Sequence, residues 1–283
     1  MVSAIAADDI AYLSALVRER DRPRYYSTLF APAEIRDDLF ALYGFAAEIA
    51  RVPELVSEPQ LGEIRLRWWS DALAEASARG GEGETPALRA VSAVIAKHRL
   101  PVSAFEALIE ARSIDLYSDP PASIGELEGR LGETESVLFQ LAAIVAGAAG
   151  PEVADAAGHA GVAHGIARRL SMLAVDRALG RTILPADILR ASEMSSAELF
   201  APALHAGLPG AVAATAAVAR GHLAEAKHRV STLRRSVRTA FLPLAVVAPL
   251  LRRIENLGTE IGVREAQLSD IESLIRIGLA RLR

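Results

Sequence analysis

Apolar residues recur every three to four positions along almost the whole chain, which is the spacing of one face of an α-helix. No stretch alternates strictly between apolar and polar residues, as a half-buried β-strand would. We therefore predict an all-α protein. The expected helices cover about residues 9–20, 33–49, 62–78, 87–98, 102–116, a short segment after 123, 133–149, 151–175, 186–191, 195–204, 209–236, 238–255 and 264–280.

Local signals place several helix boundaries. Asp8 or Asp9 is expected to cap the first helix, and Pro32 stands at the start of the second. Ser123 is a predicted cap, with Glu126 at the spacing of a capping box. Residues 78–86 are rich in Gly and Glu and predict a surface loop. Because no repeat and no low-complexity linker interrupts the pattern, residues 1–283 are interpreted as a single domain.

Composition narrows the function classes. The chain is 51% hydrophobic with a net charge of -4, and it lacks a long basic tract, so we expect no nucleic-acid partner. Residues 229–238 hold a local basic cluster, interpreted as a solvated helix face or, alternatively, as a patch for an anionic membrane or a diphosphate.

The expected location is the cytoplasm. The chain has no cysteine, which fits a reducing compartment, and its first residues lack the basic region of a secretory signal. Residues 199–219 carry no Asp, Glu, Lys or Arg, but their prolines and glycines favour two helices and a loop over a membrane span. Peripheral contact with the inner membrane is kept as an alternative.

Two blocks near the N-terminus carry a family resemblance. Residues 24–32 read Arg-Tyr-Tyr-Ser-Thr-Leu-Phe-Ala-Pro, and residues 39–49 read Leu-Phe-Ala-Leu-Tyr-Gly-Phe-Ala-Ala-Glu-Ile. They resemble the opening of a squalene/phytoene synthase, an enzyme that joins two isoprenoid diphosphates head to head. Further similar segments extend the resemblance to about residue 255. It implies the isoprenoid synthase fold, in which antiparallel helices surround a central apolar cavity.

The resemblance fails at the two acidic boxes with which such enzymes hold Mg²⁺. The first box, Asp-Asp-x-x-Asp in the usual form, here reads Ala-Arg-Val-Pro-Glu at residues 50–54. The second lies in an interval that is shorter by about one helical turn and keeps one acid, Asp176, beside Arg177. Mg²⁺ prefers carboxylate oxygens and bridges them to substrate phosphates. The chain therefore predicts no confident metal ligand and no confident catalytic residue.

A working enzyme would need unusual ligands. The candidates for Mg²⁺ in that case are Glu48, Glu54, Asp115 and Asp176. Glu54 and Asp176 should then face one another across an open cavity, whereas Arg51 and Arg177 filling that space would argue against catalysis. Residues that the resemblance places near a diphosphate or a lipid cavity are Tyr26, Ser27, Tyr43, Phe45, Arg51, Arg168, Arg169 and Arg181.

One block points to a particular branch of the family. Residues 56–69 resemble the branch that includes the mitochondrial assembly factor for respiratory complex I and its alphaproteobacterial relatives. Its adjacent Trp68 and Trp69 point about 100° apart on a helix, so one is expected in the core. The other could serve a partner surface or a membrane interface.

Two hypotheses remain open. In the first, the chain is non-catalytic, needs no cofactor, binds an isoprenoid or lipid, and supports the assembly of complex I, whose subunits would be its partners. In the second, it is an active head-to-head prenyltransferase that uses Mg²⁺. Glu133 and Glu135 replace a small cavity-lining stretch of the family, and the sequence assigns them no role.

Overall fold

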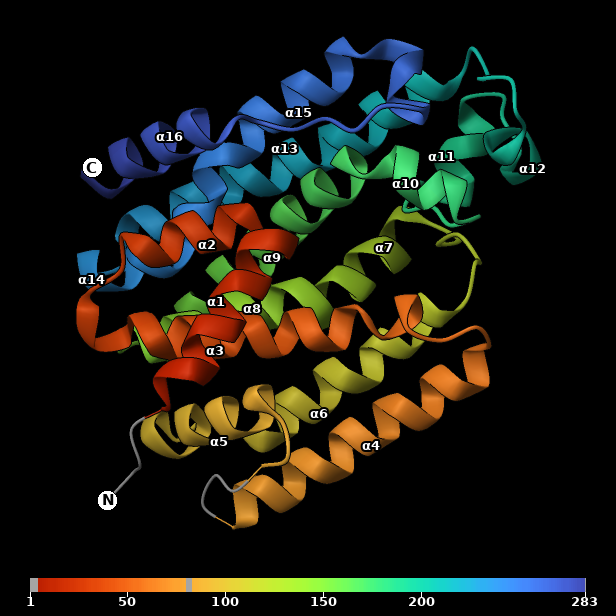
Figure 1. Ribbon diagram of the computed structural model, residues 1–283. Helices are drawn as coiled ribbons and strands as arrows, with labels where there is room; N and C mark the ends of the chain where they lie inside the picture. The colour runs from red at the N-terminus through yellow and green to blue at the C-terminus, as the bar shows by residue number, and fades with distance from the viewer. Residues whose placement is uncertain (1–4, 80–82, 283) are drawn as a thin grey trace.

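The computed structural model describes residues 5–79 and 83–282, and in this part of the chain every regular element is a helix (Figure 1). The all-α prediction is confirmed. The α-helices are α1 Ala7–Arg20, α2 Arg22–Leu29, α3 Ala33–Ala50, α4 Pro59–Ala78, α5 Pro86–His98, α6 Val102–Ala111, α7 Ile124–Leu131, α8 Val137–Val145, α9 Pro151–Ser171, α10 Leu173–Ala178, α11 Ala186–Ala191, α12 Ser196–Phe200, α13 Leu208–Thr232, α14 Arg235–Arg238, α15 Val247–Asn256 and α16 Asp270–Leu282.

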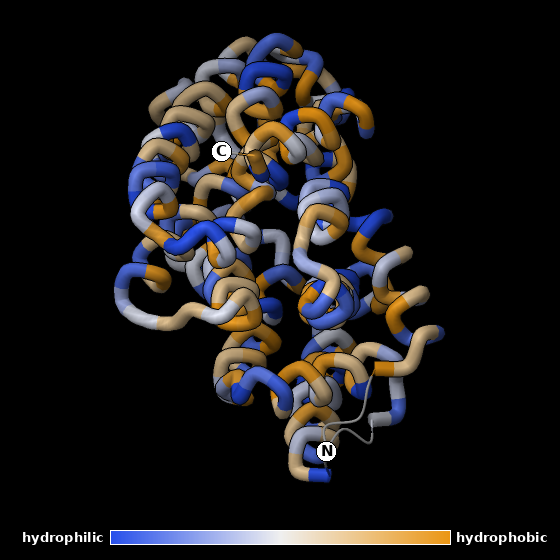
Figure 2. Tube along the Cα trace, turned by 90° about the vertical axis from the view of Figure 1, so that its left-hand side faces the viewer, coloured by the Kyte–Doolittle hydropathy of each residue, from blue (hydrophilic) through white to orange (hydrophobic). Residues whose placement is uncertain are grey.

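The helices stack in three levels. In Figure 1, α13, α15 and α16 lie at the top, α1, α2, α3, α8 and α9 in the middle, and α4, α5 and α6 at the bottom. Each helix mixes hydrophilic and hydrophobic segments, as expected where one face meets a neighbour and the other meets water (Figure 2). The core of the molecule therefore forms between the levels.

The helices α9 and α13 form the most extensive helix pair. Both are rich in alanine, and Ala156, Ala160 and Ala163 of α9 are buried, as are Ala216 and Ala219 of α13. Small side chains let two helix axes approach closely. This contact holds α9 in the middle of the bundle. The other face of α9 lines the candidate site.

Several predicted helices are interrupted, for local reasons. Residues 132–136 form a π-helix (η3, Gly132–Ser136) before α8, and residues 112–116 form a 3₁₀ turn (η2, Arg112–Leu116) after α6. Residues 239–246 also run as a 3₁₀ segment (η4, Thr239–Val246), which contains Pro243; a proline cannot donate the backbone hydrogen bond of a regular helix. The predictions of continuous helices over 102–116, 133–149 and 238–255 were therefore wrong in detail.

Other boundaries also shift. The predicted helix 151–175 ends at Ser171, and α10 starts a separate turn. The predicted helix 264–280 begins only at Asp270, after the 3₁₀ turn η5 (Gly258–Gly262) and an extended segment. Residues 80–82 of the predicted surface loop lie outside the described residues. None of the described helices is both long enough and apolar enough to cross a membrane.

The capping predictions are partly wrong. Helix α1 starts after Ala6 without a side-chain cap, and Asp9 instead pairs with Arg89 of α5 at 2.7 Å. Ser123 does cap α7, accepting from the backbone N–H of Glu126. The Glu126 carboxylate, however, accepts from Ala122 rather than from Ser123, so the capping box is incomplete.

The close approach of α9 to the π-helix can be tested at a single glycine. A Cβ on Gly161 would lie 2.2 Å from the backbone nitrogen of Ser136, whereas a Cβ on Gly158, one turn earlier, would meet nothing within 4 Å. We expect Gly161→Ala to lower the free energy of unfolding by about 1–3 kcal/mol, because a backbone must move. Gly158→Ala should raise it by about 0.5–1 kcal/mol. Urea unfolding of both variants checks this, and equal effects would contradict the close approach.

Candidate functional site

The positions of both acidic boxes meet at one pocket in the middle of the bundle, here called the central pocket. It has a volume of about 110 Å³. The end of α3 and the 3₁₀ turn η1 (Val52–Glu54) bring Arg51 and Glu54 to it, and α10 brings Asp176. Its charged lining consists of the arginines Arg20, Arg24, Arg51, Arg112, Arg168, Arg169 and Arg181 and the acids Asp21, Glu54, Asp115, Glu135 and Asp176.

The junction of α1 and α2 places the first buried charges. Asp21 ends α1 and caps α2, because its carboxylate accepts the backbone N–H of Arg24 at 3.0 Å. The same carboxylate accepts from the Arg24 guanidinium at 2.9 Å. Arg24 is 3% exposed and lies between the rings of Tyr43 and Phe139, whose centroids are 5.3 and 5.2 Å away. The local capping interaction thus fixes a guanidinium in the core, between two aromatic faces that favour a cation.

Glu135 supplies the second partner of Arg24. It lies on the π-helix η3, 4% exposed, and accepts from the Arg24 Nη1 at 2.9 Å. π-Helical turns are rare and are frequent at functional sites. Arg112 of η2 reaches the other Glu135 oxygen at 3.5 Å and pairs with Asp115 at 3.1 Å.

Helix α9 closes the cluster with His164 and Arg168. His164 Nδ1 lies 3.5 Å from the Glu135 carboxylate, and Arg168 Nε lies 3.9 Å from that of Asp21. Burial alone would raise the pKa of Glu135, but Arg24, His164, Arg168 and Arg112 together hold it well below its ordinary value. Burial raises the pKa of Asp21, but the positive charges around it, Arg24 first among them, outweigh burial. The pKa of Asp21 is therefore also below its ordinary value. We call Asp21, Arg24, Arg112, Asp115, Glu135, His164 and Arg168 the buried ion-pair network.

Arginine side chains form ion pairs with the carboxylates that could hold Mg²⁺. Arg20 donates to both oxygens of Glu54 at 2.9 and 2.8 Å, and Arg169 lies 3.2 Å from Asp176. Glu48 accepts from Tyr12 and lies 3.6 Å from Arg51. Within the described ranges no group of three or more His, Cys, Asp or Glu side chains is arranged to hold a metal ion. The residues present therefore do not fit the metal cluster that the family resemblance implies.

The central pocket instead suits an anion. Seven arginines face five acids in its lining. Six buried guanidinium nitrogens in this lining, Arg24 Nη2 and the Nε atoms of Arg20, Arg51, Arg112, Arg168 and Arg181, have no hydrogen-bond partner among the described residues. Phosphate or carboxylate oxygens are the acceptors that guanidinium groups bind best.

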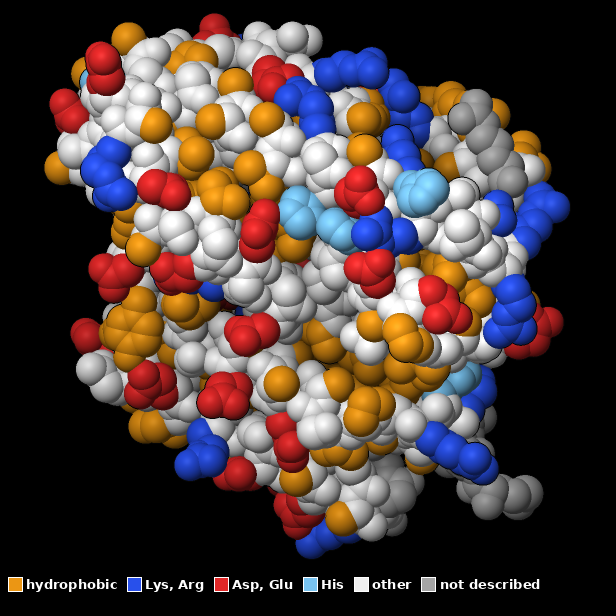
Figure 3. All heavy atoms as spheres, turned by 180° about the vertical axis from the view of Figure 1, so that it is seen from behind, with side chains coloured by type: hydrophobic (Ala, Val, Ile, Leu, Met, Phe, Trp, Pro, Cys, Tyr) orange, Lys and Arg blue, Asp and Glu red, His pale blue; other side chains and the backbone are white. Residues whose placement is uncertain are grey.

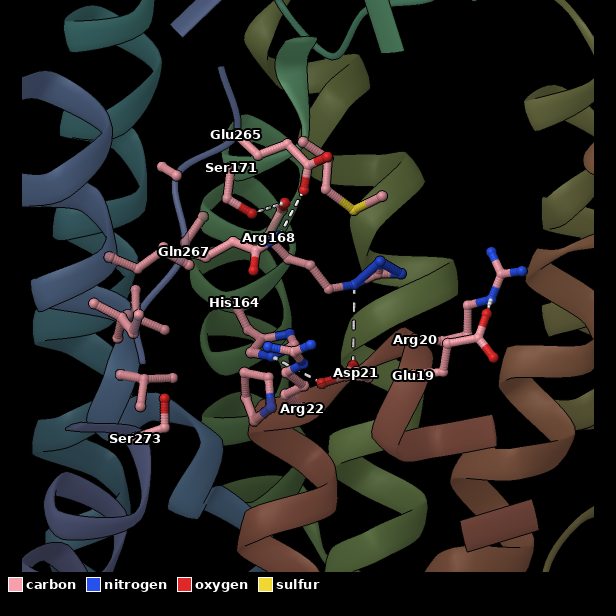
Figure 4. Close-up of a pocket in the computed structure, with 18 residues that line it drawn as sticks. Glu19, Arg20, Asp21, Arg22, His164, Arg168, Ser171, Glu265, Gln267 and Ser273 are labelled. Carbon is pink, nitrogen blue, oxygen red and sulfur yellow. Dashed lines mark hydrogen bonds and ion pairs between the residues drawn. The ribbon is translucent and has the colours of Figure 1, made fainter. Parts of the chain in front are cut away.

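A second pocket adjoins the central one and is here called the C-terminal pocket. Its volume is about 320 Å³, and it lies between the α1–α2 junction, α9, α15 and the extended segment before α16 (Figure 4). Asp21 and Arg168 line both pockets, and Val246, Val247 and Leu250 give the C-terminal pocket an apolar wall. Charged side chains thus reach the lining of both pockets, where the resemblance implied an apolar cavity.

The structure sorts the predicted site residues. Tyr43, Arg51, Arg168, Arg169 and Arg181 line the central pocket as expected, and so do Glu54, Asp115 and Asp176. Burial raises the pKa of Tyr43 to about 12, so its hydroxyl stays protonated. Burial also raises the pKa of Asp176, which Arg169 and Arg181 only partly offset. Glu48 does not line either pocket.

Other assignments need correction. Tyr26 packs with Leu242, Val246 and Ile277 beside α16, and Ser27 is buried outside both pockets. Phe45 belongs to the core, with ring centroids 5.8 Å from those of Trp69 and Phe105. Arg177 does not fill the site: it donates to the carbonyls of Leu199, Ala201 and Gly262.

The tryptophan pair divides as helix geometry requires. Trp69 is 5% exposed and is a core residue, so it is not a partner-surface residue. Trp68 is 39% exposed on the outer face of α4. Leu61 and Ile64, 50% and 67% exposed, lie two turns and one turn before it on the same face.

The sequence reasoning missed Asp21, Arg24, Arg112 and His164 as site residues and left Glu135 without a role. Arg24 and Arg112 stand inside the segments that carry the family resemblance, which was the available signal. Arg24 pairs with Glu135, which lies 111 positions away in the sequence, and no local pattern reveals such a contact.

Comparisons with known proteins agree with this fold and single out one group of relatives. The model of the family described as squalene/phytoene synthase matches residues 17–272. The chain is 26% identical over 250 residues to complex I assembly factor 6 of Homo sapiens, covering 88% of this chain and 75% of that relative. It is 28% identical over 250 residues to the homolog of that factor in Drosophila melanogaster, covering 85% and 73%.

Solved structures show the same fold at lower identity. The squalene synthase HpnC from Alicyclobacillus acidocaldarius superposes with a TM-score of 0.76 at 22% identity, covering 89% of this chain and 94% of that one. A dehydrosqualene synthase in complex with ligand gives a TM-score of 0.79 at 14% identity, covering 97% and 96%. The predicted isoprenoid synthase fold is confirmed.

Because only Glu135 belongs to the buried ion-pair network, we expect alanine substitutions at Glu135 and at nearby Glu133 to have very different effects on stability. Glu135→Ala would remove one of the two carboxylate partners of both Arg24 and Arg112, so we expect a loss of about 3 kcal/mol in the free energy of unfolding. Glu133 is exposed, so Glu133→Ala should change it by no more than about 0.5 kcal/mol. Urea unfolding at pH 7 checks both. Similar losses in the two variants would contradict the network.

The effect of Glu135 should also depend on pH. Its pKa is lower in the folded chain than in the unfolded one, so its contribution is complete above the unfolded value and is lost as the pH falls through the folded value. The stability difference between wild type and Glu135→Ala should therefore shrink below about pH 4. Unfolding curves at pH 7, 5 and 3.5 measure it. A difference that stays constant would show that Glu135 acts by packing alone.

Proposed function

The chain belongs to the squalene/phytoene synthase family, and on this premise we propose that it is a non-catalytic member that assists the assembly of respiratory complex I. The observation that carries the first part is the pairing of Glu54 with Arg20 and of Asp176 with Arg169. Magnesium ions would have to displace both arginines and would then find too few carboxylates. The names of the curated relatives support the second part.

The central pocket has a role in this proposal. It binds the anionic group of an isoprenoid or lipid through its arginines, without a metal, while the apolar wall of the C-terminal pocket contacts the hydrocarbon part. Support comes from the unpartnered guanidinium nitrogens and from the excess of arginines over acids. Binding such a ligand would stabilise the folded state, because every contact is made only in the folded chain.

The outer face of α4 is the proposed contact for a complex I subunit. Leu61, Ile64 and Trp68 form an exposed apolar stripe, and such aromatic and aliphatic side chains anchor protein interfaces. The stripe belongs to the segment whose sequence resembles the assembly-factor branch. Core packing does not account for these three exposed side chains.

The first experiment asks whether the protein is an enzyme. Purified protein is incubated with farnesyl or geranylgeranyl diphosphate and Mg²⁺, and pyrophosphate release is measured beside a family member with intact acidic boxes. We expect no release above the uncatalysed background, because the carboxylates are held by arginine. Turnover that Asp176→Ala abolishes would overturn the proposal in favour of a prenyltransferase.

The second experiment asks whether the protein supports complex I. In a deletion strain, NADH oxidation by isolated membranes and assembled complex I on native gels should both fall, and the wild-type gene should restore them. Ile64→Glu and Trp68→Ala should reduce the rescue several-fold, as loss of an interface anchor does. Val263→Glu, at a side chain that is 57% exposed on another part of the surface, is the control and should rescue fully. A deletion strain with normal complex I would contradict the assembly role.

A further inference from the structure

Helix α16 is apolar on two opposite faces. Its inner face buries Ser273 and Ile277 and packs Leu274 and Ala280 against the cluster that contains Tyr26, Leu242 and Val246. Its outer face carries four exposed side chains: Ile271, Ile275, Leu279 and Leu282 are 71%, 57%, 54% and 73% exposed.

The spacing of the outer residues places them in one narrow stripe. They recur at intervals of four, four and three residues, so they fall within an arc of about 80° on the helix surface. A helix at the surface of a globular protein normally carries polar residues there. Contiguous exposed apolar patches of this kind mark contacts with a protein or a membrane.

Four arginines near the C-terminal end of α16 and on α14 or just before it donate hydrogen bonds to backbone carbonyls. Arg235 of α14 donates to the carbonyl of Leu282 at 3.1 Å, and Arg281 donates to that of Phe30 at 3.4 Å. Arg234 and Arg238 likewise donate to backbone carbonyls, at Gly147 and at Leu233 and Ser231. Across the described residues none of these four arginines forms an ion pair with a carboxylate.

The two features share one end of the molecule. α14 and the C-terminal end of α16 lie together at the left of Figure 1. In the view from behind, Lys and Arg side chains gather beside apolar ones at the upper right (Figure 3). The C-terminal end of the apolar stripe and Arg235 therefore lie at the same end of the molecule.

We propose that the outer face of α16, with the arginines of α14, docks on the surface of an anionic lipid bilayer. A helix that lies in a membrane interface combines an apolar stripe, which enters the acyl boundary, with flanking basic residues that meet lipid phosphates. Charge decides between the occupants: an anionic surface complements these arginines, whereas a second copy of this face would bring like charges together. This surface is distinct from both pockets and from the stripe on α4.

The test is co-sedimentation with vesicles of phosphatidylcholine alone or with 30% phosphatidylglycerol. We expect the full chain to bind the anionic vesicles, to bind the neutral ones weakly, and to dissociate as salt is raised. Ile275→Glu and Leu279→Glu should each weaken partition at least about tenfold, because an apolar side chain no longer leaves water. Arg235→Ala should weaken it about fivefold.

The control is Val263→Glu, which alters a side chain outside both apolar stripes that is 57% exposed, as Ile275 is, and should leave vesicle binding unchanged. Because the substituted side chains of α16 face away from the core, the thermal unfolding of these variants should match that of the wild type. Vesicle binding needs neither complex I nor a pocket ligand, so its outcome is independent of the proposed function.

Four results would overturn the proposal. The wild type could fail to bind anionic vesicles at low salt, or it could bind them equally well after Leu279→Glu. A stable dimer by light scattering that Leu279→Glu converts to monomer would assign the face to a second copy. Failure of Leu279→Glu to rescue complex I, with no vesicle binding by the wild type, would assign it to a protein partner.

Discussion

The buried guanidinium of Arg24 is the interaction on which the middle of this molecule depends. A charge that is 3% exposed is tolerable only when acids stand beside it, and here Asp21 and Glu135 both lie at 2.9 Å. The ion pairs of Arg24 with Asp21 and Glu135 therefore connect the α1–α2 junction to the π-helix before α8. The π-helical turn places Glu135 where a regular helix would have turned it elsewhere, and α9 adds His164 and Arg168 to the same cluster.

That network explains how a family scaffold can be present without the family's metal chemistry. Acids remain around the central pocket, but Glu54, Asp115 and Asp176 each form an ion pair with an arginine, so guanidinium groups stand where magnesium ions would. Arginine forks bind anionic oxygens as readily as carboxylates hold a cation. In the proposed function, the site holds an anion without the metal ions that would stabilise a departing diphosphate.

The surface divides into regions with different chemistry. The α4 stripe is apolar with both acidic and basic residues beside it, which suits a protein, whereas the arginines near the end of the α16 stripe have no carboxylate partner among the described residues. A protein held at a bilayer by one face and contacting a membrane-complex subunit by another would act at the place where such a complex is built. Both surfaces consist of apolar side chains that the helix bundle does not bury in its core.

The sequence alone determined the helical class, the family and the position of most helices, because the 3.6-residue period and the motifs around residues 24–54 are local. It also predicts that the segments around Ala50, Arg51 and Asp176 do not make the family's usual metal boxes. It missed the π-helix at 132–136 and the 3₁₀ segment at 239–246, since these depart from regular helix without breaking the apolar period. Only the tertiary structure decided that Glu135 pairs with Arg24, that Arg169 rather than Arg177 pairs with Asp176, and that Trp68 rather than Trp69 is exposed. The physical reason is the same in each case. The partners of a buried charge or ring are the side chains that folding brings within a few ångströms of it. Those side chains are distant in sequence, or their direction depends on a local helix geometry that the residue pattern does not encode.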